Sequence, residues 1–242
     1  MTNDETKILP VRETLKQAYK YMLENEKVIH PLWFVHIVLC AAVNLIEGGF
    51  SNPLSLVWAI FYYMFWCVFF RMYYQKKPYF SLKRMGAGLL PSTKMFFLSF
   101  SILLLLVVLP YIPLLMGFHN RYLAAFERYM AAIQAPEMSL YNTAVFSLVF
   151  LVISPIVFCR PYLAWISSLQ GCSGSIKKVF KKTKGNDMQF VYLMFLLNLP
   201  CFAAYGFDSL IGCFGWFSVI FCSIYLIYFN VVFAKVYDFF YQ

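Results

Sequence analysis

Six long apolar segments constrain the fold of this chain more than any other feature of its sequence. A helix that crosses a lipid bilayer needs about 20 mostly apolar residues, with a range of roughly 17–25. The first segment is short for a span, and the others reach the length that a span requires. The sequence therefore predicts an all-α fold, a polytopic membrane helix bundle with six transmembrane helices. We place the spans at residues 31–46, 54–74, 95–118, 140–165, 188–207 and 214–234.

The composition excludes an ordinary soluble protein. Hydrophobic residues make up 62% of the 242 residues, charged residues make up only 13%, and the mean hydropathy is +0.67. A soluble domain has about 45–50% apolar and about 25% charged residues. A surface with so few charges requires lipid as its solvent. The cysteines form no CxxC pair and no Cys/His ligand spacing, so we predict no metal site and no cofactor.

The basic residues indicate which end of each span faces the cytoplasm. Of the 20 Lys and Arg residues, all but Arg121 and Arg128 fall on one side of the six-span arrangement. Cytoplasmic loops carry an excess of Lys and Arg, so this bias predicts that both termini are cytoplasmic. We therefore divide the chain into a cytoplasmic amphipathic segment (1–30), a six-span membrane domain (31–234) and a cytoplasmic tail (235–242).

Three stretches that precede spans one, three and five share one pattern. "SIKKVFKKTKGND" precedes span five and "LKQAYKYMLENE" precedes span one, and the two align without a gap. In both, apolar residues recur every three or four positions, which is the spacing of one helix face. "SLKRMGAGLLPSTK" before span three repeats the pattern more weakly. We therefore predict three repeated units, each a basic amphipathic helix followed by a two-helix hairpin.

An apolar stripe backed by lysines is typical of a helix that lies in the headgroup region of a membrane. Each basic residue near an anionic leaflet contributes about 1 kcal/mol of attraction. The alternative is that these residues are ordinary flanks of spans, and that Arg160 only snorkels to the surface. No RNA-binding motif accompanies the lysines, so we predict anionic membrane lipid, and no nucleic acid, as their partner. The predicted headgroup contacts are Lys177, Lys178, Lys181, Lys182, Lys184, Arg160, Lys16, Lys20, Lys83 and Arg84.

The stretch "KVFKKTKGNDMQFVYLMFLLNL" carries a family resemblance. A basic helix that ends in a "tKGN"-like element and leads into a span resembles the YciC-type bacterial inner-membrane proteins. It is also similar to the membrane domain of some glycerophosphodiester phosphodiesterases. A tryptophan that is common ahead of this element in the group is replaced here by Phe180. The resemblance implies a multi-pass protein of the bacterial inner membrane, and it implies no particular reaction.

Polar residues inside the spans are the other candidates for function, because polar groups at membrane depth are costly. One face of span one could line a polar path, or His36 could bond a backbone carbonyl while Glu47 reaches the outer headgroups. Prolines in "LPYIP" and "SPIVFCRP" could kink spans three and four around such a path, or kink them only structurally. Two asparagines in the last two spans could instead bond neighbouring helices. The predicted path residues are His36, Asn44, Glu47, Asn198 and Asn230.

The sequence contains no Walker A motif, no GxGxxG after a strand, no HExxH and no GxSxG. We therefore predict no catalytic residue and no enzyme. The favoured hypothesis is a non-enzymatic integral inner-membrane protein that organises anionic lipid or partner proteins through basic interfacial helices. One alternative is an accessory subunit or assembly factor of a larger membrane complex, or a homo-oligomer. Another is a small solute or proton transporter.

Overall fold

A computed structural model of the chain describes residues 7–44, 53–75, 151–170, 175–211 and 216–241. Every regular element in these ranges is a helix, which confirms the predicted all-α fold for this part of the chain. Span three and the start of span four lie outside the described residues, as do Glu47, Lys83 and Arg84. The elements are α1 (Val11–Glu24), α2 (Glu26–Asn44), α3 (Pro53–Gln75), η3 (Pro155–Cys159), α8 (Arg160–Leu169), α9 (Ile176–Lys182), α10 (Asp187–Ile211) and α11 (Trp216–Tyr241).

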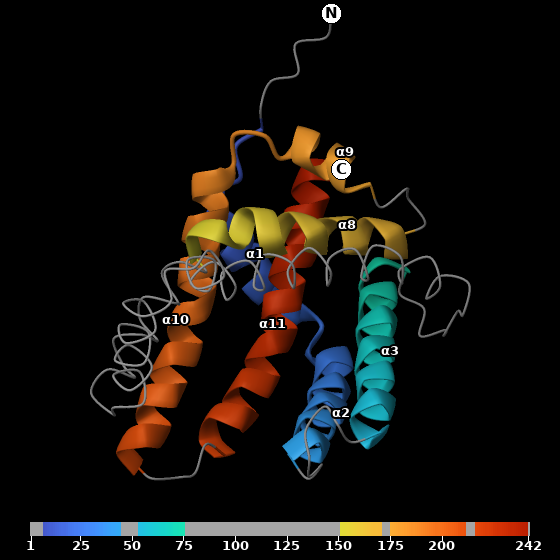
Figure 1. Ribbon diagram of the computed structural model, residues 1–242, viewed down its shortest axis with the longest axis vertical. Helices are drawn as coiled ribbons and strands as arrows, with labels where there is room; N and C mark the ends of the chain where they lie inside the picture. Colours follow the sequence, from blue (N-terminus) through green and yellow to red (C-terminus); the bar gives the residue numbers. More distant parts are fainter. Residues whose placement is uncertain (1–6, 45–52, 76–150, 171–174, 212–215, 242) are drawn as a thin grey trace, which may run out of the picture.

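Four long helices, α2, α3, α10 and α11, run roughly along one another through the molecule (Figure 1). α10 packs against α11, and α2 packs against both α3 and α11. Each of the four contains most of a predicted span, although α11 continues to Tyr241, beyond the predicted end at residue 234. Among the described residues, three helices are long and apolar enough to cross a membrane: α10, α11 and the helix Leu151–Leu169. The described part of the chain is therefore compatible with a membrane protein.

α1 is an amphipathic helix, as its sequence predicts, and it packs mainly on α11. Its buried side carries Val11, Thr14 and Ala18. Lys16 and Lys20 are exposed on the rest of its surface. Only Asn25 separates α1 from α2, and α2 begins at Glu26, whose carboxylate complements the positive N-terminal end of the helix dipole. A long apolar helix thus follows the amphipathic one directly, and α9 and α10 repeat this order.

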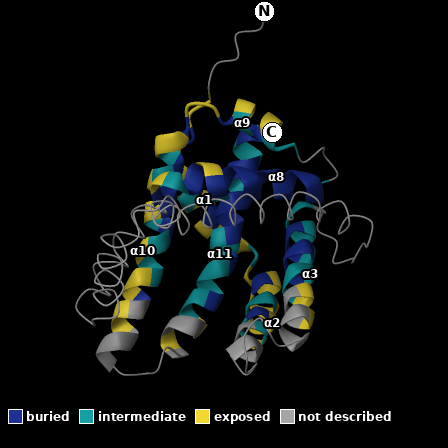
Figure 2. Ribbon diagram, in the orientation of Figure 1, coloured by how far each residue is buried: buried dark blue, intermediate teal, exposed yellow. Residues whose placement is uncertain are grey.

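The helix Leu151–Leu169, which holds the described part of predicted span four, lies across the long helices instead of beside them (Figure 1). All ten residues of α8, its second half, are buried (Figure 2). Of the most apolar window of this helix, 78% is buried inside the protein, compared with 28% for the window in α10. Burial inside the protein therefore accounts for its apolar sequence. The predicted hairpin of spans three and four is not confirmed, because span three and the start of span four lie outside the described residues.

A π-helical turn, η3, interrupts this crossing helix at Pro155. Proline has no N–H to donate to the carbonyl of Leu151, four residues earlier. The Ser154 hydroxyl donates to that carbonyl instead, at 2.8 Å. The Arg160 N–H then donates to the Pro155 carbonyl, five residues earlier. The wider turn shifts the helix register, and this sets the direction in which the Arg160 side chain leaves α8.

Candidate functional site at the junction of α8, α9 and α10

The lysine-rich segment forms α9, a short helix that packs on the protein along one side. Val179 and Thr183 are buried, and Ile176 packs against the hydrophobic core. The predicted apolar stripe of this segment therefore faces the protein, not lipid headgroups. The five lysines of the segment are all exposed: Lys177, Lys178, Lys181, Lys182 and Lys184.

The lysines give this end of the molecule a positive surface. Lys177, Lys178 and Lys184 form no ion pair with any described residue. Lys182 contacts the end of α11, where its Nζ donates to the Phe240 carbonyl at 3.4 Å and lies 4.0 Å from the centre of the Tyr241 ring. Four of the seven residues of α9 are therefore exposed lysines.

A turn at Gly185 joins α9 to α10. Its φ of 80° lies in the left-handed region, where a residue with a Cβ carries a penalty of roughly 1–2 kcal/mol. α10 begins two residues later, at Asp187. The "TKGND" element is therefore a tight turn that places the polar side chains of Thr183, Asn186 and Asp187 next to α8 and the N-terminal segment.

Arg160, the first residue of α8, is held by this turn. Its Nε donates to Thr183 Oγ1 at 2.9 Å, and its Nη2 donates to the Thr183 carbonyl at 3.3 Å. Its Nη1 donates to Asp187 Oδ1 at 2.6 Å, which is also an ion pair. The guanidinium lies over the Phe180 ring, 4.6 Å from its centre, and 5.8 Å from the centre of the Phe190 ring.

These contacts correct the prediction that Arg160 reaches lipid headgroups. Its side chain is only 4% exposed, whereas the Asp187 side chain is 57% exposed. A buried cation is strongly unfavourable unless an opposite charge and hydrogen-bond acceptors surround it. The planar guanidinium meets that need with three donors and two aromatic faces. Arg160 is therefore a structural residue that fixes α8 to the start of α10.

Asn186 holds the N-terminal segment against the same turn. The Leu9 N–H donates to Asn186 Oδ1 at 2.7 Å, and Asn186 Nδ2 donates to the Lys7 carbonyl at 2.8 Å. The side-chain amide thus binds one backbone N–H and one backbone carbonyl of the N-terminal segment. Asn186 is fully buried and Leu9 is 2% exposed, so water does not compete for the first of these bonds.

The aligned asparagine of the first unit makes a different contact. Asn25 Nδ2 donates to the carbonyl of Tyr21, one turn earlier in the same helix, at 2.8 Å. The two repeated units therefore share their order of helices and an acidic residue at the start of the long helix. Only the unit at Asn186 uses its asparagine to bind a distant part of the chain.

Another polar cluster joins α1, α3 and α11. The Tyr73 hydroxyl donates to Asp238 Oδ2 at 3.1 Å. Lys235 Nζ lies 5.2 Å from the centre of the Tyr21 ring and 5.5 Å from that of Tyr73. Burial, and then the negative charge of Asp238, raise the pKa of Tyr21 above that of an ordinary phenol. The cluster anchors α1 to the long helices.

His36 is fully buried between three helices. Its Nδ1 lies 2.8 Å from the Ser223 carbonyl on α11, and its Nε2 lies 3.2 Å from the Tyr62 hydroxyl on α3. In the neutral ring Nδ1 donates to the carbonyl, which leaves Nε2 to accept from the hydroxyl. His36 therefore makes the carbonyl contact that the sequence offered as the alternative to a polar path.

The other predicted path residues lie apart from this contact. Asn198 Nδ2 donates to the Met194 carbonyl within α10. Asn230 accepts a hydrogen bond from the Tyr162 hydroxyl, and its Nδ2 donates to Leu226, so it ties α11 to α8. α2 ends at Asn44, whose side chain is not among those that the structure describes. In the described part of the chain these contacts connect or cap helices and do not line a path.

Sequence reasoning missed the residues that hold the junction together. Thr183, Asn186 and Asp187 were noted only as parts of a family-like element and of a repeat. One sequence feature could have indicated them: they are polar residues that flank a glycine and lie between two apolar segments. The described residues contain no group of three His, Cys, Asp or Glu side chains that could hold a metal ion.

No family model, curated protein or solved structure matches this chain. The resemblance to the YciC-type proteins therefore stays a prediction. The residues and their geometry are the grounds for the function proposed below.

Proposed function

We propose that this protein is a non-enzymatic integral membrane protein that organises anionic lipid or partner proteins through basic helices at its cytoplasmic surface. In this proposal α2 and α3 form one membrane-crossing hairpin, and α10 and α11 form another. The excess of Lys and Arg on one side of the predicted spans supports a cytoplasmic position of both termini. The resemblance to the YciC-type proteins supports a bacterial inner membrane as the location in this proposal.

The exposed lysines around α9 are the observation that supports this proposal most strongly. They lie at the end of the molecule where α10 begins and α11 ends (Figure 1). If α10 and α11 cross the membrane, this end is next to one membrane surface. An excess of Lys is typical of the cytoplasmic surface, which also carries the anionic lipids.

Replacing all five lysines of the α9 segment by glutamine tests the proposal. Each lysine close to an anionic surface contributes about 1 kcal/mol at low salt, and Lys182 contributes less because it also contacts α11. We expect the glutamine variant to bind phosphatidylglycerol several-fold more weakly than the original protein. Native mass spectrometry of the purified protein, titrated with phosphatidylglycerol or phosphatidylcholine, measures the difference.

The matched control replaces the same five lysines by arginine, which keeps the charge. The arginine variant should retain the preference for phosphatidylglycerol. Added salt should weaken this preference in the original protein and in the arginine variant. Equal phosphatidylglycerol binding by the glutamine and arginine variants would contradict the proposal.

An accessory subunit of a larger membrane complex is a second candidate, because α10 presents an unusual outer face. Its exposed apolar residues recur at alternating steps of four and three, which is the seam of a helix that packs on another helix. The seam consists of Met188, Tyr192, Phe195, Leu199 and Phe202. Purification in a mild detergent followed by native mass measurement tests this candidate. A partner or a second copy supports it, and a lone monomer counts against it.

A further inference from the structure

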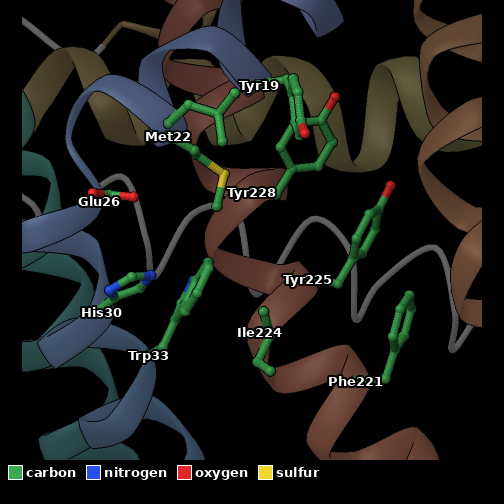
Figure 3. Close-up of a pocket in the computed structure, with 10 residues that line it drawn as sticks. Tyr19, Met22, Glu26, His30, Trp33, Phe221, Ile224, Tyr225 and Tyr228 are labelled. Atoms are coloured by element: carbon green, nitrogen blue, oxygen red, sulfur yellow. The ribbon is translucent and has the colours of Figure 1, made fainter.

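A pocket of about 380 Å³ lies between α1, α2 and α11 (Figure 3). Tyr19 and Met22 come from α1, Trp33 comes from α2, and Ile224 and Tyr225 come from α11. The lining is almost entirely apolar or aromatic, and its charged or titratable members are Glu26 and His30, at the start of α2. Pockets of this size and character hold small ligands that are largely apolar.

The pocket lies along the part of α11 that is apolar enough to cross a membrane. Its α11 residues run from Phe221 to Tyr228, about 10 Å along the helix axis. They fall within the apolar window Ile220–Tyr241. The Tyr228 hydroxyl donates to the Leu15 carbonyl, so α1 packs at one end of this stretch. With α1 at the membrane surface, the pocket lies at the depth where acyl chains begin.

Trp33 contributes its indole ring to the pocket wall. Tryptophan is enriched at the membrane interface, which agrees with a pocket near the membrane surface.

We propose that this pocket takes one acyl chain of a membrane phospholipid, because its lining is largely apolar and its α11 wall lies within the apolar window of that helix. The inference rests on the proposed function, because it requires α1 to lie at the membrane surface. Lys16 precedes the pocket residue Tyr19 by one turn of α1, and it is exposed. Its positive charge complements the phosphate of the lipid.

A photolabelling map tests the proposal on the full chain. The protein is reconstituted into vesicles of phosphatidylethanolamine and phosphatidylglycerol that contain a trace of phosphatidylcholine with a diazirine in one acyl chain. We expect labelling per residue at Met22 and Ile224 to exceed that at the exposed Val38 and Phe195 about fivefold, which corresponds to ~1 kcal/mol of preference. Equal labelling of the pocket and the exposed helix faces would overturn the proposal.

Two variants on one helix supply a matched comparison. Ile224 lines the pocket, whereas Ile220, one turn earlier on α11, is 46% exposed and does not line it. Ile224→Trp should fill the pocket and remove the excess labelling of Met22. Ile220→Trp makes the same change of side chain and should leave that labelling unchanged. Loss of the excess in both variants, or in neither, would contradict a chain held in the pocket.

The pocket and the proposed function can fail separately. Glutamine in place of the five α9 lysines tests anionic-lipid binding and leaves the pocket residues unchanged. If that variant keeps its phosphatidylglycerol preference while Ile224→Trp loses its pocket labelling, the proposed function fails and the pocket stands. If the glutamine variant loses its phosphatidylglycerol preference while Ile224→Trp keeps its pocket labelling, the pocket proposal fails and the proposed function stands.

Discussion

Replacing Asn186 by alanine tests how the N-terminal segment is held to the start of α10. The change removes the acceptor of the buried Leu9 N–H and the donor to the Lys7 carbonyl. A buried N–H without a partner costs about 1–3 kcal/mol, and an accessible hydrogen bond contributes about 0.5–1 kcal/mol. Lys7 is exposed, so water can replace the second bond. We therefore expect the free energy of unfolding to fall by about 1.5–4 kcal/mol.

Asn25→Ala is the matched control, because it removes the aligned asparagine of the first unit. Asn25 is half-buried and bonds only a carbonyl of its own helix, so the same change should cost about 0.5–1 kcal/mol. Asn186→Asp is a second comparison. It keeps an acceptor for the Leu9 N–H but buries a carboxylate whose second oxygen faces the Lys7 carbonyl, so it should destabilise the protein at least as much as Asn186→Ala.

Two assays measure the effect in detergent. Unfolding followed by circular dichroism gives the loss of stability, and hydrogen exchange reports whether the Leu9 amide opens. We expect Leu9 to lose its protection in Asn186→Ala and to keep it in Asn25→Ala. Equal destabilisation by the two alanines, with Leu9 still protected, would refute the role assigned to Asn186.

The other predictions concern the buried polar contacts. Arg160→Lys keeps the charge but cannot serve Thr183 and Asp187 together, so the free energy of unfolding should fall by about 2–3 kcal/mol. Asp187→Asn leaves the buried Arg160 guanidinium without an opposite charge, so it should also cost about 2–3 kcal/mol, and unchanged thermal unfolding of this variant would contradict the ion pair. His36→Phe should destabilise the protein by about 0.6–2 kcal/mol, because it loses the contact to the Ser223 carbonyl. Unchanged thermal unfolding of this variant would show that the buried histidine does not tie the helices together.

Local pattern was sufficient to predict several helices. The spacing of apolar residues predicts α1, whereas α2 begins at Glu26, five residues before the predicted start of span one at residue 31. Long apolar runs predict the four long helices to within a few residues at most ends. These features depend on neighbours within a few turns, which the sequence displays directly.

The orientation of α8 and the role of Arg160 could not be predicted in the same way. An apolar helix has the same sequence pattern whether lipid or protein covers it, so nothing local shows that α8 crosses the bundle. Arg160 binds Thr183 and Asp187, which are more than 20 residues away. Asn186 binds Leu9 from the opposite end of the chain. Such contacts depend on how helices distant in sequence are brought together.

The central claim is that α1 and α9 lie at one membrane surface while α2 and α10 pass through the lipid. Spin labels at the exposed positions Lys20, Lys178, Val38 and Phe195 measure it in a cysteine-free protein in vesicles, through collisions with oxygen and with a water-soluble nickel complex. The account predicts headgroup depth for the labels on α1 and α9, on the same side, and hydrocarbon depth for the labels at Val38 and Phe195. Labels on α1 and α9 at opposite surfaces, or labels at Val38 and Phe195 in water, would contradict it.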